Sequence, residues 1–265
     1  MKFAFKTLVA AAAFVAAGAA SAQQWQFVSG SGGLTFSGDA LSALSASGSN
    51  VITARTVPTI TGLDISGATN TAAYTKATGN VNLTFSAATV TGDSLTSLHA
   101  ANSLVEIQRN VFNDDETITK RSIFMANFDV NLATSTISAD LYSRTNVGAL
   151  VSYGTRSIFT ADIPGVVGGT EGNIVVTGGG FWPTGAASGS LAGSLRMNLG
   201  TADLILASLG LSTAESDPVA ILVRSSNWGT TQAAGTFAVP EPSTYAMFGM
   251  GLLAVGAVAR RRKAA

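Results

Sequence analysis

The chain has 265 residues, no cysteine and a formal charge of zero, with 15 basic and 15 acidic residues. That neutrality comes from the two ends, because residues 23–239 contain nine basic and fourteen acidic residues and so carry a charge of −5. A mildly acidic body without a basic stripe argues against a nucleic-acid partner and against binding to an anionic membrane surface. Without disulfides, the body must hold together by its core and its hydrogen-bonded strands.

The N-terminal segment, residues 1–22, has the features of a secretory signal peptide. Two lysines supply a basic start, residues 8–19 form a short apolar run, and Ala20 and Ala22 fit the small-residue site that signal peptidase cleaves. The alternative is a membrane anchor, but the run is short and rich in alanine. We therefore expect a signal helix that is removed after Ala22.

The body is rich in Gly, Ser, Thr, Ala and Asn, a composition typical of short strands joined by tight turns. Apolar residues recur with period two over residues 25–36, which predicts a hairpin or a pair of short strands. Residues 37–46 predict a short helical turn with Asp39 as its cap. Residues 51–61 are expected to be extended, and Pro58 suggests a sheet edge.

Two stretches further along resemble the beginning of the body. Residues 83–86 repeat the LTFS of residues 34–37, and residues 93–100 repeat the pattern of residues 39–46, which predicts a second strand followed by a capped helical turn. A weaker third copy spans residues 195–209. The alternative is that a chain rich in Ser and Thr reuses similar short strand and turn sequences by chance.

Two hairpins are the clearest sheet signals. Residues 104–112 alternate, residues 113–116 turn, and residues 117–124 return. Residues 128–132 then face residues 137–141 across a second turn. In both pairs one face is apolar and the other polar, which indicates antiparallel strands packed on one side.

The remaining segments complete an all-β fold. With roughly ten to twelve strands and two or three short helices, we expect one antiparallel β-sandwich or a barrel-like pair of sheets. Trp25 and Trp228 are expected in the core or at its boundary. Further strands are predicted at residues 148–159, 172–177, 191–199 and 219–223, followed by a polar spacer at residues 229–237.

Few groups are candidates for catalysis. His99 is the only histidine, and it lies in the second predicted helical turn. A zinc site without cysteine or a second histidine would need carboxylates alone, which is unusual. A Ser-His-Asp arrangement would lack the G-x-S-x-G motif that singles out a nucleophile. We therefore expect His99 to be a structural or surface residue, and the body to be non-catalytic, without a metal or cofactor.

Asn113, Asp114, Asp115 and Glu116 form the densest acidic run. Oxygen ligands in such a turn could hold Ca²⁺ outside the cell. However, the D-x-[DN]-x-[DN]-G spacing of calcium loops is absent, and a solvated hairpin turn is the commoner explanation.

Phe181 and Trp182 lie in a glycine-rich stretch, residues 178–185. Exposed aromatic rings in a loop can stack on sugar rings, which makes these two residues a candidate sugar-stacking site. The alternative, which we favour, is an aromatic plug that closes one end of the sheet pair.

The last 26 residues consist of three parts in order. Residues 245–259 form an uncharged apolar block, which as a helix would be about 22 Å long, short of the roughly 30 Å hydrocarbon core. Snorkelling basic residues and local thinning can still accommodate it, with its basic end in the cytoplasm. The block is preceded by Pro240, Glu241 and Pro242 and followed by Arg260, Arg261, Arg262 and Lys263.

This order of parts, over residues 239–263, resembles the PEP-CTERM sorting signal of exported proteins of Gram-negative bacteria. The resemblance implies recognition and cleavage near residues 240–242 by an exosortase, a membrane-embedded transpeptidase-like enzyme. It also implies a setting of exopolysaccharide, biofilm or floc. A plain C-terminal anchor is the alternative.

We therefore expect a signal peptide at residues 1–22, an extracytoplasmic β-domain at residues 23–238 and a sorting signal at residues 239–265. The leading hypothesis is a surface or extracellular-matrix protein with a structural or adhesive role. A carbohydrate-binding module is the alternative, and a polysaccharide-acting hydrolase is less favoured. The expected partners are signal peptidase, exosortase, the inner membrane in transit and exopolysaccharide, and no nucleic acid.

Overall fold

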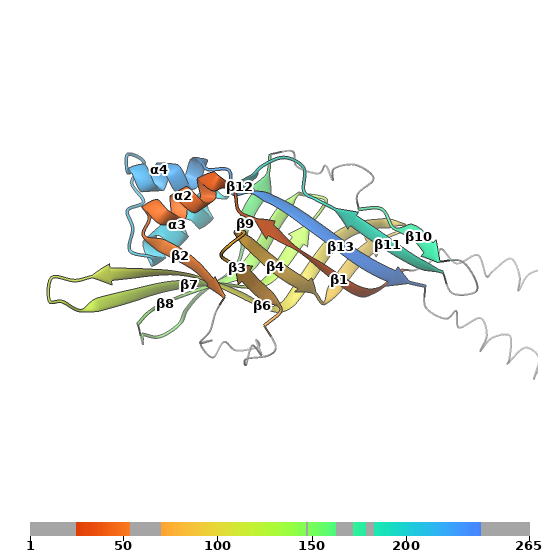
Figure 1. The fold of residues 1–265 in the computed structure, drawn as a ribbon, viewed down its shortest axis with the longest axis horizontal. Helices are drawn as coiled ribbons and strands as arrows, with labels where there is room; N and C mark the ends of the chain where they lie inside the picture. Colours follow the sequence, from red (N-terminus) through yellow and green to blue (C-terminus); the bar gives the residue numbers. More distant parts are fainter. Residues whose placement is uncertain (1–24, 54–69, 147, 163–171, 179–182, 240–265) are drawn as a thin grey trace, which may run out of the picture.

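The computed structural model describes residues 25–53, 70–146, 148–162, 172–178 and 183–239 (Figure 1). Within these residues the chain forms two antiparallel β-sheets and three short helices, so the expectation of a β-rich sheet pair is confirmed. None of the helices described is long and apolar enough to span a membrane. The expected signal helix and the apolar block of the tail lie outside the described residues.

The first sheet, called sheet A here, has the strand order β10-β11-β13-β1-β4-β3. Its two middle strands, β13 and β1, come from opposite ends of the body and pair from Gln26 opposite Ala238 to Thr35 opposite Thr230. Its strands are β1 (Gln26–Thr35), β3 (Ala72–Thr75), β4 (Asn80–Phe85), β10 (Val175–Gly178), β11 (Thr184–Gly189) and β13 (Thr230–Ala238).

The second sheet, sheet B, has the order β12-β9-β8-β7-β6-β2, and β5 also pairs with β6. In Figure 1 the hairpin of β6 and β7 extends beyond the body at one end of the long axis, and β10 lies toward the other end. The strands of sheet B are β2 (Ser49–Thr53), β5 (Ala87–Thr91), β6 (Ser94–Phe112), β7 (Ile118–Asn131), β8 (Thr136–Thr145), β9 (Val151–Ala161) and β12 (Leu195–Met197).

The first helix, α2 (Gly38–Ala46), forms where a short helical turn is predicted, but Asp39 is not its cap. Ser37 has an extended backbone, and its hydroxyl accepts a hydrogen bond from the amide of Ala40 at 3.1 Å. Asp39 lies inside the first turn, where a carboxylate favours the helix dipole without capping it.

The predicted strand at residues 219–223 is wrong, because this segment is the helix α4 (Pro218–Ser225). The Asp217 carboxylate accepts hydrogen bonds from the amides of Val219 and Ala220 at 2.9 and 3.1 Å, and Pro218 occupies the first helical turn. These capping signals outweigh the β-branched residues that favour a strand.

The helical turn predicted at residues 93–100 is also wrong, because these residues begin β6. Leu98 and Ala100 are buried on either side of the more exposed His99, which is the period of a strand. The second copy of the proposed repeat therefore lacks its helix. The third copy does have a strand and a helix, in β12 and α3 (Leu199–Ser208).

Two other predictions for the ends of the body are corrected. Residues 25–36 contain the single long strand β1 rather than a hairpin, since its glycines continue the strand instead of turning it. The polar spacer predicted at residues 229–237 is the strand β13, which pairs on both sides. Because β13 consists mainly of small and hydroxyl residues, its sequence shows little hydrophobic alternation. In the structure Thr231 and Phe237 are buried, whereas Gln232 is exposed.

The core lies between the sheets and extends to the helices. Trp228 is 2% exposed and packs its ring near Phe36 and Phe159, with centroids 6.2 and 5.7 Å away. Its indole Nε1 donates to the carbonyl of Val223 in α4 at 3.0 Å, so one side chain joins the helices to the sheets. Trp25 is only 8% exposed, and both Trp25 and Trp228 lie in the core as expected.

Truncation of Trp228 is predicted to destabilise the body strongly. Trp228→Ala removes the aromatic contacts and leaves a cavity, which should lower the free energy of unfolding by about 3–5 kcal/mol. Trp228→Phe keeps an aromatic ring and should cost less. Denaturant unfolding followed by circular dichroism measures both, and equal small losses would contradict the role of this side chain.

Candidate functional site

Charge is segregated between the two sheets. The strands of sheet A contain no Asp, Glu, Lys or Arg. The exposed side chains of sheet A are therefore uncharged; most are polar or small, and the apolar Val28, Val175 and Val176 are exposed as well. The strands of sheet B carry nine charged residues, which are Glu106, Arg109, Lys120, Arg121, Asp129, Asp140, Arg144, Arg156 and Arg196.

The solvent side of sheet A contains two adjoining hollows, which we call the trough. One hollow, over β1, β3, β4, β11 and β13, has a volume of about 870 Å³, and the other, over β1, β10, β11 and β13, has about 600 Å³. They share Ser31, Ser188 and Ala234, so the trough crosses the sheet. Each volume is within the range of ligand pockets, roughly 300–1,000 Å³.

Several polar side chains of the trough point to solvent without a partner. Asn82 of β4 and Gln232 of β13 are both exposed and both lie opposite Gly33 of β1. Their amide groups make no side-chain hydrogen bond to any described residue. The same is true of the hydroxyls of Ser31, Thr84 and Ser188, so the trough offers free donors and acceptors.

Gly33 keeps the middle of the trough bare. A Cβ atom on Gly33 would lie 2.1 Å from the carbonyl oxygen of Val81, a distance that real side chains do not reach. The same holds for Gly32, where a Cβ atom would meet the carbonyl oxygen of Gln232 at 2.5 Å. The floor between the two amides is therefore open backbone.

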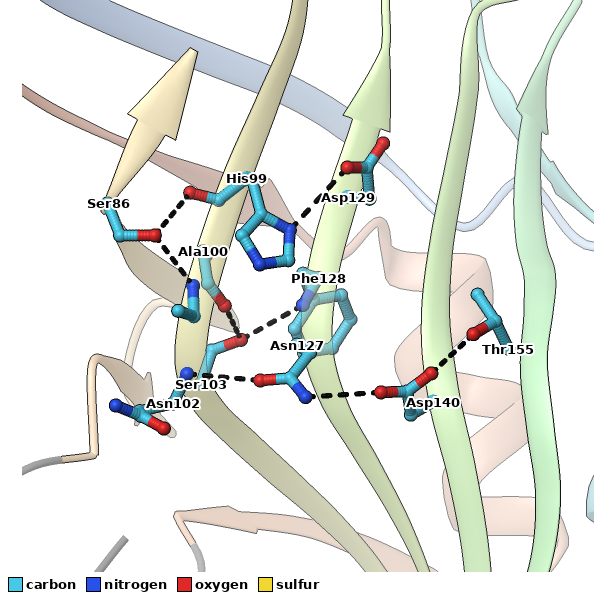
Figure 2. Close-up of polar contacts among 11 residues, drawn as sticks. Ser86, His99, Ala100, Asn102, Ser103, Asn127, Phe128, Asp129, Asp140 and Thr155 are labelled. Carbon is cyan, nitrogen blue, oxygen red and sulfur yellow. Dashed lines mark hydrogen bonds and ion pairs between the residues drawn. The ribbon is translucent and has the colours of Figure 1, made fainter. Parts of the chain in front are cut away.

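Polar residues near the middle of sheet B, in contrast, are engaged with one another (Figure 2). The pairing of β6 with β7 is interrupted between Ala100 and Leu104, and the pairing of β7 with β8 is interrupted between Ala126 and Asp129. Asn102 and Asn127 have positive φ angles of 56° and 52° there, a conformation that asparagine tolerates better than most residues.

The side chains of Asn127, Ser103 and Asp140 form hydrogen bonds across this interruption. The Asn127 amide accepts from the Asn102 N–H at 3.1 Å and donates to the Asp140 carboxylate at 3.1 Å. Buried Ser103 donates to the Ala100 carbonyl at 2.6 Å and accepts from the Phe128 amide at 3.0 Å. The Thr155 hydroxyl donates to the other oxygen of Asp140, which extends the network to β9.

His99 lies beside this network, in a cross-strand pair with Asp129. Its Nδ1 is 3.5 Å from the Asp129 carboxylate, and both side chains are about two-fifths exposed, so the pair contributes only about 0–1 kcal/mol to stability. The nearby Ser86 hydroxyl donates to the His99 carbonyl at 3.1 Å and accepts from the Ala101 amide at 3.0 Å. Ser86 is therefore bonded to backbone groups and does not face the imidazole as a nucleophile would.

The acidic run forms the turn between β6 and β7. Asp115 accepts hydrogen bonds from the hydroxyl and the amide of Thr117 at 2.6 and 3.1 Å. The hydroxyl first, and then the amide, hold the pKa of the exposed Asp115 below its usual range. No group of three or more His, Asp or Glu gathers to hold a metal ion anywhere in the described part of the chain.

The alternation predicts that one face of the sheet B hairpins is polar, but the structure shows an apolar cluster on that face. Leu104, Phe124 and Ala126 are fully buried on the face opposite the core, with Tyr142 and Leu150 packed against them. Burial, and then the charge of Asp140, raises the pKa of Tyr142. This small second cluster makes sheet B apolar on both faces near its middle.

The remaining predicted site residues lie outside the described residues. These are the cleavage pair Ala20 and Ala22, the sugar-stacking pair Phe181 and Trp182, the sorting residues Pro240, Glu241 and Pro242, and the basic cluster Arg260, Arg261, Arg262 and Lys263. Their roles stay predictions. Sequence reasoning missed the trough, because Asn82 and Gln232 are ordinary strand residues until the fold places them on either side of Gly33.

Comparison with known proteins identifies the tail. Residues 238–263 match the family described as the PEP-CTERM protein-sorting motif, which confirms the resemblance seen in the sequence. The motif is the recognition signal for exosortase processing, so the chain is an exported protein with a C-terminal membrane anchor before processing. The body is not assigned to a family.

No curated protein matches the chain. Among solved structures, the C-terminal domain of HtaA from Corynebacterium glutamicum is similar at 11% sequence identity and a TM-score of 0.40, and the match covers 81% of this chain and 99% of that one.

Replacement of Asn127 is predicted to separate backbone strain from hydrogen bonding. Asn127→Ala loses both amide bonds and places alanine at a positive φ, so it should lower the free energy of unfolding by about 2–4 kcal/mol. Asn127→Gly loses the same bonds but relieves the strain, so it should cost about 1 kcal/mol less. Chemical denaturation of both variants measures the difference, and equal losses would refute the strain at this position.

The pKa of Asp115 is predicted to depend on Thr117. Thr117→Val removes the hydroxyl donor at nearly constant shape, so the pKa of Asp115 should rise toward its ordinary value. Because this pKa is depressed in the folded chain, its contribution to stability is present at neutral pH and is lost as the pH falls through the folded value. Carboxyl NMR titration measures the shift. Thr119→Val, which leaves the Asp115 contacts intact, is the control, and an equal shift there would contradict the assignment.

Proposed function

We propose that this protein is a non-catalytic structural or adhesive component of the cell surface or the extracellular matrix, in an exopolysaccharide setting. The observation that carries the proposal is the sorting motif at residues 238–263, which directs the body out of the cell. The function of the body is therefore performed outside the inner membrane.

Two features of the body support a binding role rather than a catalytic one. The polar side chains around Asn127 and Asp140 bond to one another and to the backbone. The free polar side chains are spread over the trough, whose described lining offers no titratable group to move a proton. This arrangement favours contact over a broad surface.

The export route is tested with one epitope tag in the body and a second after Lys263. The body tag should be found at the cell surface or in the medium without the second tag, because the exosortase removes the tail. Replacement of Pro240, Glu241 and Pro242 by alanine should leave the full chain, with both tags, in the inner membrane fraction. A triple variant with Ser212→Ala, Thr213→Ala and Ala214→Gly, in an exposed loop of the body, is the matched control.

Two outcomes would refute the sorting part of the proposal. One is a body that stays in the cytoplasm, and the other is a surface protein that retains the second tag. A hydrolase role would instead be indicated by release of soluble sugars from matrix polysaccharide.

A carbohydrate-binding module remains the second candidate. One observation favours it: Phe181 and Trp182 fall between the end of β10 at Gly178 and the start of β11 at Thr184, two strands whose outer faces line the trough. On this reading the two rings would add stacking to the polar contacts of sheet A. Loss of glycan binding in Trp182→Ala would support a stacking role, and unchanged binding would count against it.

A further inference from the structure

We propose that the trough of sheet A binds a neutral polysaccharide, held as an extended chain across the strands by the amides of Asn82 and Gln232. This inference deepens the proposed function, on which it rests for the presence of the body outside the cell. It assigns the contact to residues of the folded sheet rather than to the aromatic loop.

Charge selects the class of ligand. Among the described residues that line the trough none is charged, so there an anionic polysaccharide or a nucleic acid would find no cation to replace its counterions. The Trp, Tyr and Arg residues that dominate protein–protein interfaces are also absent from the described lining. An uncharged ligand fits this surface, and it needs apolar as well as hydroxyl groups, because half of the described residues that line the second hollow are Ala, Gly or Val.

The hydrogen-bonding groups fit hydroxyl-rich ligands. Each amide presents a donor and an acceptor, and each serine or threonine hydroxyl can act as either, so together they match sugar hydroxyls, which are also both. Because Asn82 and Gln232 face the same residue, Gly33, from the two strands beside it, their backbones are about 10 Å apart, or two strand spacings. The two amides can therefore contact a ligand that lies over Gly33 from both sides.

The shape of the trough indicates a chain rather than a single sugar. The hollow around Gly33 continues through Ser31 and Ser188 into the second hollow, which ends over β10. Since the floor carries small side chains and bare backbone, the ligand can lie flat on the sheet. Many hydrogen bonds exchanged with water contribute little each, so we expect weak binding to one repeat and tighter binding to a long chain.

The test is affinity electrophoresis of the full chain in a polyoxyethylene detergent, which carries no sugar. Gels contain dextran, soluble starch, galactomannan or xyloglucan as neutral probes, or alginate as an anionic probe. At least one neutral probe should retard the protein, by the same amount at 0.1 M and 0.5 M NaCl. Retardation by no neutral probe, or retardation by alginate that disappears at high salt, would overturn the proposal.

Matched variants locate the contact. Asn82→Ala and Gln232→Ala should each weaken binding about fivefold, the effect of roughly one hydrogen bond, and the double variant should weaken it more than tenfold. Asn82→Asp places a charge in the trough at constant shape and should also weaken binding. Asn110→Asp makes the same change at an exposed position of the β6–β7 hairpin and should leave binding unchanged.

Two results would assign the binding elsewhere. If the double variant binds as the parent does, the trough is not the site. If Trp182→Ala abolishes binding and the double variant does not, the aromatic loop is the site. Neither binding result depends on export, whereas the tag experiment tests export alone. A failure of polysaccharide binding at the trough can therefore be distinguished from a failure of the proposed location outside the cell.

Discussion

Strands β6 and β7 pair over most of their length, and their shared interruption near Ala100 and Ala126 is one of the places where the two sheets are joined. On one side, Ser103 and Asn127 satisfy the backbone groups that the interruption leaves unpaired. On the other side, the Asn70 side chain bonds to the backbone of both Leu104 and Ala72, at the start of β3 in sheet A. Buried backbone groups must be paired, so this set of bonds allows sheet B to change direction next to sheet A.

The same constraint explains why the polar residues of the two sheets behave differently. In sheet B, asparagines, serines and aspartates are used internally, to connect β6, β7, β8 and β9. In sheet A, the outward hydroxyl pairs Ser29–Thr236 and Thr177–Thr184 bond across the strands, while the side chains of Asn82 and Gln232 make no hydrogen bond to a described residue. One sheet therefore acts as a rigid support, while the other presents a surface, and the segregation of charge follows the same division.

Sequence reasoning succeeded where local patterns and packing agree. The hairpin around Asn113 and the turn before residue 137 were predicted because alternation and turn residues coincide there. It failed at α4, where five apolar residues suggested a strand although Asp217 and Pro218 signal a helix start. It failed at β13 because a strand of Thr, Ala and Gly, stabilised by partners on both sides, has little hydrophobic alternation of its own. The trough could not be foreseen, since it depends on register between strands that are distant in sequence.

The position of β13 has a mechanical consequence. This strand ends at Ala238, where the matched sorting motif begins, and it pairs with β1 along its whole length and with β11 from Ala233 to Ala238. Any force that reaches the body through its C-terminus is therefore applied along a central strand. Such a load acts on many hydrogen bonds of both ladders at once, in shear, instead of opening them one at a time from an edge. A body that is held at its C-terminal end while its matrix is pulled would resist extension from the attachment point inward.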